Sequence, residues 1–212
     1  MFRDRLDAAH QLAERLRHTD GQNPLVLAIP RGGVPMGRVI AVALHGDLDV
    51  VLVHKIGAPA NPEYAIGAVS EDGTVQLRDD AWERRYPQRI REEIDDQLAV
   101  LRQRRRQYTP VRPPIDPTDR VVIVVDDGSA TGATMEAALT TLRNRAPRRL
   151  IAALGVAPAG VVTRLADIAD EVVCVSSPSP FFAVGQHFID FGQVSDAEVI
   201  ACLQPPGDTG YD

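Results

Sequence analysis

The sequence is poor in cysteine, in aromatic residues and in long apolar runs, and each shortage narrows what the chain can be. It has 212 residues, of which two are cysteines and 5% are aromatic. Cys174 and Cys202 suit reduced thiols in the cytosol better than a disulfide-stabilised secreted fold. No apolar run approaches the ~20 residues of a membrane span, and residues 1–18 contain no apolar signal-peptide core. We therefore expect a soluble, cytoplasmic protein with no membrane partner.

An excess of basic charge is also missing. The chain carries 23 lysines and arginines against 29 acidic residues, a formal net charge of −6. Proteins that bind nucleic acids usually present a basic footprint, so we expect no nucleic-acid partner. The length suits one domain with a substantial core.

Short runs of branched apolar residues alternate with helical stretches along most of the chain. Buried strands are expected at residues 24–30, 49–55, 121–127, 149–157 and 171–177. An amphipathic first helix with Leu6, Leu12 and Leu16 is expected before them, and further helices at residues 36–44, 132–145 and 160–169. Continuous Val, Ile and Leu strands alternating with helices indicate a parallel sheet covered on both faces. The predicted fold class is α/β.

Two segments interrupt this alternation. Residues 64–77 contain two short apolar runs around the turn at residues 71–73, which predicts a hairpin. Residues 88–107 follow Pro87, a favourable first helical residue, and carry one apolar stripe formed by Ile90, Ile94, Leu98 and Leu101. This helix ends in a cluster of arginines at residues 102 and 104–106. The cluster is either a solvated helix end or a surface for phosphates or a partner subunit.

The stretch VVIVVDDGSATGATMEAAL, residues 121–139, places two acids and a loop of small residues between a buried strand and a helix. Residues 128–134 leave their backbone N–H groups uncovered, and the helix directs the positive end of its dipole at them. With hydroxyls from Ser129, Thr131 and Thr134, this loop suits a phosphate monoester. Asp126 and Asp127 would repel that phosphate, so they fit vicinal hydroxyls or a hydrated divalent cation.

Hydroxyls and a phosphate at this separation indicate a ribose 5-phosphate as ligand. Taken alone, the acids could be an ordinary helix cap. Taken alone, the loop of small residues could be an ordinary turn. Other nucleotide motifs fit worse, because the loop has no P-loop lysine and the chain has no G-x-G-x-x-G. The spacing Asp126-x-Gly128-x-Ala130-x-Gly132 approaches a methyltransferase motif but lacks its middle glycine.

The stretch VVIVVDDGSATGATM resembles the phosphoribosyl-diphosphate binding motif of type I phosphoribosyltransferases, and weaker similarity extends over residues 24–191. The resemblance implies a Rossmann-like, doubly wound parallel sheet in a single domain of residues 1–212. That domain would comprise a core at about 20–178, a helical insertion at about 82–108 and a small C-terminal hood at about 178–203. The resemblance also implies phosphoribosyl diphosphate as donor, Mg²⁺ as cofactor, a homodimer, and a role in nucleotide salvage with an acceptor that is not identified.

By this resemblance, Asp126 and Asp127 engage the ribose hydroxyls. The 5-phosphate would be held by Gly128, Ser129, Ala130, Thr131, Gly132, Ala133 and Thr134. The stretch AIPRGGVPMG resembles the diphosphate loop, in which Arg31, Gly32 and Gly33 offer charge and bare amides; a tight strand-to-helix turn is the plainer interpretation. Family members often have a cis non-proline peptide in this loop. Lys55, just past a strand end, would present a second cation to the diphosphate.

Further candidates come from two other segments. HKIGAPANPEYAIG resembles the mobile loop of adenine phosphoribosyltransferases, and makes Glu63 a candidate for proton transfer or a plain loop carboxylate. FFAVGQHFIDFG resembles the hood of purine salvage enzymes with one extra residue, so that Phe182 would stack on a base or belong, like Phe181 and Phe188, to the hood core. Asp190 would approach a metal with Asp126 and Asp127, through water or substrate.

The predicted function is a phosphoribosyltransferase that moves ribose 5-phosphate to a nitrogenous acceptor, such as a nucleobase, and releases diphosphate. Asp127, Arg31, Lys55 and Glu63 are the candidate catalytic residues. The alternative is a sensor that binds the donor without turnover, because hypoxanthine-type enzymes usually carry an aspartate at the position of Ala130. Residues 156–158 also lack the lysine that reads a 6-oxo group, which disfavours a 6-oxopurine acceptor.

Overall fold

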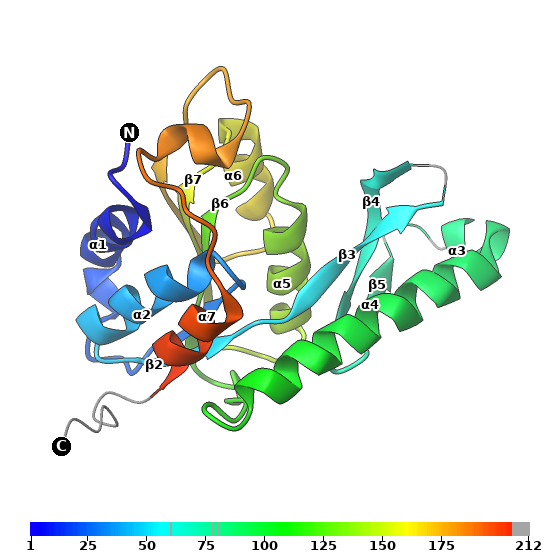
Figure 1. Cartoon of the computed structure of the whole chain (residues 1–212), viewed down its shortest axis with the longest axis horizontal. Coiled ribbons are helices and arrows are strands. Elements are labelled where there is room, and N and C mark those ends of the chain that lie inside the picture. The colour runs from blue at the N-terminus through cyan, green and yellow to red at the C-terminus, as the bar shows by residue number, and fades with distance from the viewer. Residues whose placement is uncertain (60, 78, 80, 205–212) are drawn as a thin grey trace.

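The centre of the protein is a parallel sheet. The structure, a computed structural model, describes residues 1–59, 61–77, 79 and 81–204, and of residues 61–65 the backbone alone. Within these residues, five parallel strands run in the order β2–β1–β6–β7–β8 (Figure 1). Their bounds are β1 Leu25–Ala28, β2 Asp47–Val50, β6 Val121–Gly128, β7 Arg149–Val156 and β8 Glu171–Ser176. The predicted α/β class is confirmed.

Helices cover both faces of this sheet. On one face lie α1 Arg5–Arg15, α2 Gly33–Ala43 and α7 Asp196–Leu203, and on the other α5 Ala133–Arg143 and α6 Ala159–Leu165. Successive strand residues alternate between the two cores, so that Val26 and Ile123 pack in one and Leu27 and Val124 in the other. This double burial explains the uniformly apolar strands. Two 3₁₀ helices, η1 Arg17–Thr19 and η2 Val184–His187, complete the described core.

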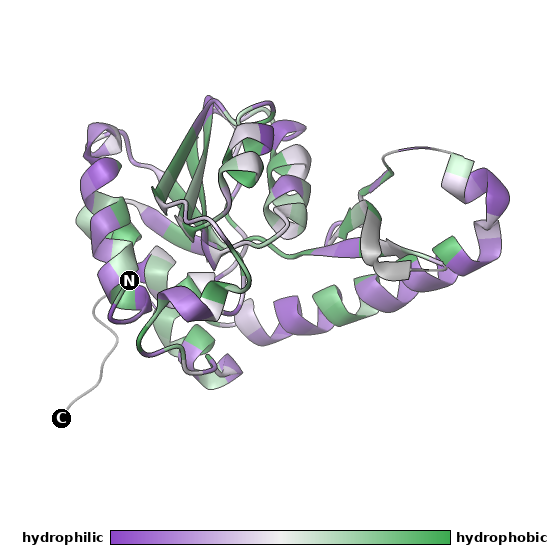
Figure 2. Cartoon of the chain, turned by 90° about the horizontal axis from the view of Figure 1, so that it is seen from above, coloured by the Kyte–Doolittle hydropathy of each residue, from purple (hydrophilic) through white to green (hydrophobic). Residues whose placement is uncertain are grey.

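An arm extends from the sheet domain (Figures 1 and 2). It is built from an antiparallel sheet, β3 Val53–Ala58, β4 Asn61–Ser70 and β5 Val75–Leu77, with α3 Ala81–Arg85 and α4 Pro87–Tyr108 alongside. The predicted hairpin and the predicted long helix are both present in this arm. Gly73 in the turn has φ +87°, which glycine adopts without strain. Figure 2 shows α4 as largely hydrophilic, and among the helices described none is long and apolar enough to cross a bilayer.

Two expectations from the sequence are wrong. The single strand expected at residues 49–55 is two strands, because β2 ends at Val50 in the parallel sheet and β3 begins at Val53 in the arm. A branched apolar run favours extended backbone but does not specify its pairing partner, and the chain changes sheets within the run. Leu6 is 46% exposed, whereas Leu12 and Leu16 are buried, because Leu6 lies on the outer side of α1.

Arg105 on α4 joins the arm to the edge of the parallel sheet. Its guanidinium donates to Asp49 Oδ1 on β2 at 3.0 Å, to Glu71 Oε1 in the hairpin turn at 2.6 Å and to the Val50 carbonyl at 3.0 Å. Asp49 is 2% exposed and also accepts the Ile115 amide at 3.0 Å. The network thus satisfies a buried carboxylate while fixing helix, turn and strand together.

We expect Arg105→Ala to lower the free energy of unfolding by about 3–5 kcal/mol, because it leaves the buried Asp49 carboxylate without its counter-charge. Urea denaturation measures this change. The matched control is Arg106→Ala, an exposed neighbour on the same helix, for which a change within about 0.5 kcal/mol is expected. Equal midpoints for the two variants would contradict the role of Arg105.

Candidate functional site

Two loops meet at the carboxyl edge of the parallel sheet. Residues 29–33 follow β1 and residues 129–132 follow β6, and these strands are neighbours with Ala28 paired to Val125. Ligands of open parallel sheets collect at this edge, in the crevice between such loops. The structure therefore brings the two main sequence motifs together, although about 100 residues separate them in the chain.

In the loop after β6, some backbone amides donate hydrogen bonds to protein acceptors and others do not. The Gly132 amide donates to Ser129 Oγ at 2.9 Å, and the Ser129 amide donates to the Val156 carbonyl at 3.0 Å. Ala130 and Thr131 are exposed, and within the described chain their amides donate to no protein acceptor. Gly132 has φ +80° just before α5 begins, a conformation that favours glycine. An anion can therefore receive the amides of residues 130 and 131 and the positive end of α5.

Asp126 and Asp127 lie beside this loop with different surroundings. Asp126 accepts the Asp127 amide at 2.9 Å. The desolvation of its carboxyl, together with the neighbouring Asp127 charge, raises the pKa of Asp126 well above its ordinary value. Asp127 is 9% exposed and accepts a charged hydrogen bond from Arg5 Nε at 2.7 Å. The pair therefore concentrates negative charge that a cation or hydroxyl donors would stabilise.

Arg5 is a site residue that sequence reasoning missed. It lies on α1, and its Nη1 donates to the Gly192 carbonyl at 2.7 Å. Its guanidinium also stands 3.9 Å above the ring of Phe191. Arg5 thus connects Asp127 to the segment of residues 178–203, which we call the hood. No motif signals this contact, since 122 positions separate Arg5 from Asp127.

The loop after β1 approaches the acid pair at contact distance. A Cβ on Gly32 would lie 2.0 Å from Asp127 Oδ2, and a Cβ on Gly33 would lie 2.5 Å from the Val125 carbonyl oxygen. Glycine is therefore required at both positions for the loop to sit this close to β6. The Pro30–Arg31 peptide is cis, the feature that family members often carry. Arg31 is half-buried, and among the described residues its side chain forms no hydrogen bond or ion pair.

A cavity of about 240 Å³ opens beside the same loop. Its lining includes Pro30, Lys55 from β3 and Thr134 from α5, so the structure brings Lys55 to the candidate site. Arg104 from α4 also lines the cavity, although the sequence did not single it out from its arginine neighbours. The cavity therefore lies between the diphosphate loop, the arm and the start of α5.

The remaining candidates belong mostly to the hood and differ in their exposure. Phe182 is 74% exposed, whereas Phe188 is 5% exposed and belongs to the core, as one of the two interpretations of the hood aromatics expected. Asp190 is exposed and accepts the Gly192 amide at 3.2 Å. In the described chain no three His, Cys, Asp or Glu side chains form a metal-binding group. The side chain of Glu63 lies outside the described residues.

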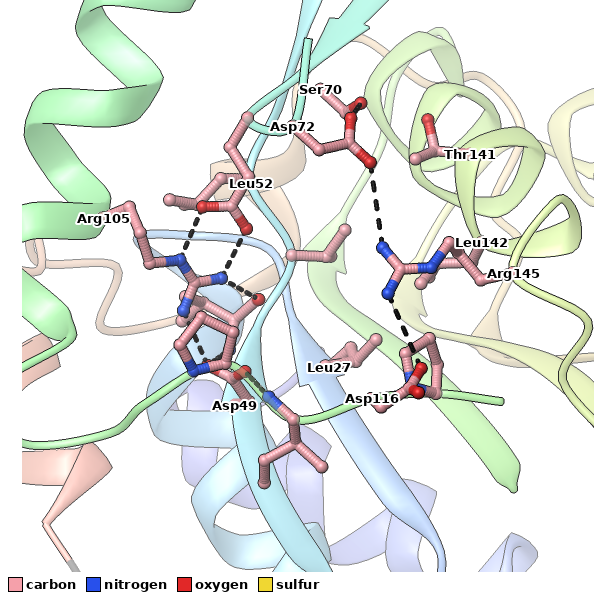
Figure 3. A pocket seen from close by; sticks show the side chains of 16 residues that line it. Leu27, Asp49, Leu52, Ser70, Asp72, Arg105, Asp116, Thr141, Leu142 and Arg145 are labelled. Carbon is pink, nitrogen blue, oxygen red and sulfur yellow. Dashed lines mark hydrogen bonds and ion pairs between the residues drawn. The ribbon is translucent and has the colours of Figure 1, made fainter. Parts of the chain in front are cut away.

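A larger cavity of about 420 Å³ at the base of the arm has a different character (Figure 3). Arg105 there is paired with Glu71, as described above. Arg145 stands between Asp72 at 3.8 Å and Asp116 at 3.5 Å. Acids of the chain therefore neutralise both arginines of this larger cavity.

Comparisons with known proteins agree with this geometry. A family model described as a phosphoribosyl transferase domain matches residues 3–187. Proteins from two strains of Mycobacterium tuberculosis, each named "Putative phosphoribosyl transferase", are 42% identical over 205 residues. The match covers 96% of this chain and 46% of each relative, so the chain spans about half the length of the curated relatives it matches. The crystal structure of TT1426 from Thermus thermophilus is 46% identical with a TM-score of 0.87, covering 95% of this chain and 97% of that chain.

We expect Asp126→Asn to stabilise the protein at neutral pH while removing a candidate ligand group. Because the folded-state pKa of Asp126 is raised, its charging costs stability as pH rises from the ordinary carboxyl value through the raised one. Thermal unfolding should show a melting temperature about 2–4 °C higher for the variant near pH 8. The difference should shrink as pH falls and vanish well below about pH 4, where the wild-type carboxyl is protonated in both states.

Asp170→Asn is the matched control with the opposite sign. Burial opposes ionisation of Asp170, but hydrogen bonds from Arg143 and from the Leu150 amide outweigh it and lower the pKa of this carboxyl. Its contribution to stability is present above the ordinary carboxyl pKa and is lost as pH falls. Destabilisation by both variants near pH 8 would contradict the assignment of Asp126.

Proposed function

Because the chain belongs to the phosphoribosyl transferase family, we propose that it moves ribose 5-phosphate from phosphoribosyl diphosphate to a nitrogenous acceptor and releases diphosphate. The observation that carries the proposal is the meeting of three groups at adjacent strand ends. These are the acid pair at residues 126–127, the exposed amides at the start of α5, and a loop with the unpaired Arg31. They correspond to the hydroxyls, the 5-phosphate and the diphosphate of the donor.

In the proposed reaction, the bond between the anomeric carbon and a diphosphate oxygen breaks with its electron pair leaving on diphosphate. A new bond forms between that carbon and the acceptor nitrogen, which then loses its proton. Arg31 and Lys55 would stabilise the charge that grows on the departing diphosphate. The loop before α5 would hold the 5-phosphate, so that binding energy at one end of the donor orients the reacting carbon.

Mg²⁺ fits this site as an ion held chiefly by the substrate. The raised pKa of Asp126, caused by desolvation and by Asp127, supports this because a cation would offset the repulsion between the two carboxylates. Asp126 and Asp127 would hold the ion through water or the ribose hydroxyls, and Asp190 through water or the diphosphate. When bound, Mg²⁺ neutralises diphosphate charge.

The acceptor side of the proposal rests on the hood. Phe182, 74% exposed, has a ring available for stacking on a planar base. Val156, Ala157 and Pro158 at the end of β7 provide no cation for a 6-oxo group. We therefore propose that the acceptor is a nucleobase without a 6-oxo group. The reaction would then be a nucleotide salvage reaction.

A donor-binding sensor is the second candidate function. Ala130 stands where a proton-transfer aspartate is common in the resembling enzymes, and the exposed Ala130 position carries no carboxylate. Both functions predict donor binding, and only the transferase predicts turnover. Incubation with phosphoribosyl diphosphate, Mg²⁺ and a panel of nucleobases separates them: diphosphate release that depends on a base supports the transferase, and tight donor binding without release supports the sensor.

We expect Arg31→Ala to weaken binding of Mg²⁺–phosphoribosyl diphosphate by about 10–100-fold. Hydrogen bonds to charged groups contribute about 1.5–3 kcal/mol each, which corresponds to that range. Isothermal titration calorimetry measures the change. Arg38→Ala is the control, since Arg38 lies on α2 and lines a different cavity with His45 and Leu203. Unchanged affinity in Arg31→Ala would remove the diphosphate loop from the proposal.

A further inference from the structure

Helix α4 carries a half-buried arginine with no protein partner. In the described chain the side chain of Arg104 forms no hydrogen bond or ion pair. With no acceptor from the described chain, the N–H donors of this guanidinium are left to the water of the cavity that Arg104 lines. An anion supplied from outside the chain would satisfy them.

Among the arginines at residues 102 and 104–106, only Arg104 is half-buried without an acceptor from the described chain. Arg105 is saturated by Asp49, Glu71 and the Val50 carbonyl. Arg102 and Arg106 are exposed, so water satisfies them. Arg104 alone within the cluster of residues 102 and 104–106 faces a cavity of about 240 Å³, the one that Lys55 also lines.

The charged side chains that line this cavity indicate the charge of the ligand that it suits. Arg104 and Lys55 are the charged residues among its lining, which includes no aspartate or glutamate of the described chain. The remaining contacts include Pro30, at the cis peptide that precedes Arg31, and Thr134, in the first turn of α5. A cavity with two cations and no acid suits a multiply charged anion.

The position of Tyr108, one turn further along α4, supports the same grouping. Burial and Asp196 raise the pKa of Tyr108, and the charges of Arg104 and Arg31 oppose that rise. Both guanidiniums are therefore within electrostatic range of one phenol. Tyr108 is itself fully buried and donates to Asp196 Oδ1 at 3.3 Å, which fixes this end of α4 against α7.

We propose that Arg104 binds the diphosphate of the donor, as a third cation beside Arg31 and Lys55, delivered to the site by the arm. The proposal rests on the proposed function and adds a residue to it from outside the loops that carry the motifs. In this arrangement three positive charges stabilise the departing diphosphate, and two of them, Lys55 and Arg104, belong to the arm. Docking of the arm by Arg105 is then a condition for diphosphate binding.

The test uses the full chain and three probes: inorganic diphosphate with Mg²⁺, phosphoribosyl diphosphate with Mg²⁺, and ribose 5-phosphate. We expect Arg104→Gln to weaken the first two by about 10-fold, measured by calorimetry, and to leave ribose 5-phosphate unchanged, because that probe lacks the diphosphate. Arg102→Gln, an exposed change on the same helix, should alter none of them. Arg104→Lys, which keeps the charge, should recover part of the lost affinity.

The outcomes separate the two proposals. If the wild type binds the donor and Arg104→Gln binds diphosphate equally well, the role of Arg104 is overturned while the proposed function stands. If the wild type binds neither donor nor diphosphate, both are overturned. Equal weakening of all three probes would indicate a displaced arm and also count against a diphosphate contact. Urea midpoints matching the wild type within error exclude a folding defect in each variant.

Discussion

The arrangement of this protein depends on one buried network, in which Arg105 binds Asp49 of the parallel sheet and Glu71 of the hairpin turn. An isolated antiparallel hairpin beside a hydrophilic helix is marginal in water, so the arm needs a strong attachment to the core. A carboxylate that is 2% exposed supplies it, because removing the guanidinium leaves a buried charge. Lys55 on β3 and Arg104 on α4 both belong to this arm, and both line the cavity beside the loop at residues 29–33.

Two adjacent arginines on α4 therefore differ in their hydrogen-bond partners. The chain supplies acceptors to Arg105, which contributes to folding, whereas in the described residues the side chain of Arg104 has no acceptor. The two cavities also differ: in the larger one Arg145 is flanked by Asp72 and Asp116, and among the described residues no acid lines the smaller one.

Local pattern predicted much of this protein. Apolar periodicity indicated the parallel strands and α5, and the acids and glycines at a strand end indicated the site, because each signal is contained within about 20 residues. Long-range contacts were not predictable in this way. The run at residues 49–55 pairs with β1 as far as Val50 and with β4 from Val53 onward, and local pattern does not show this change of sheet. The apolar stripe of α4, which ends at Leu101, indicates which side of the helix packs inward, but it does not indicate that Arg105 meets acids of the chain while Arg104 lines the cavity.

Arg5 shows how such a long-range contact joins the two halves of the site. Its guanidinium neutralises Asp127 on the donor side, while its remaining contacts, the Gly192 carbonyl and the Phe191 ring, belong to the hood. Loss of the charge on Asp127 would therefore weaken the hold on the hood. The family model begins at residue 3 and so includes Arg5, before the first strand of the sheet. Helix α1 is thus part of the site as well as a cover for the sheet, because the central acid takes its counter-charge from there.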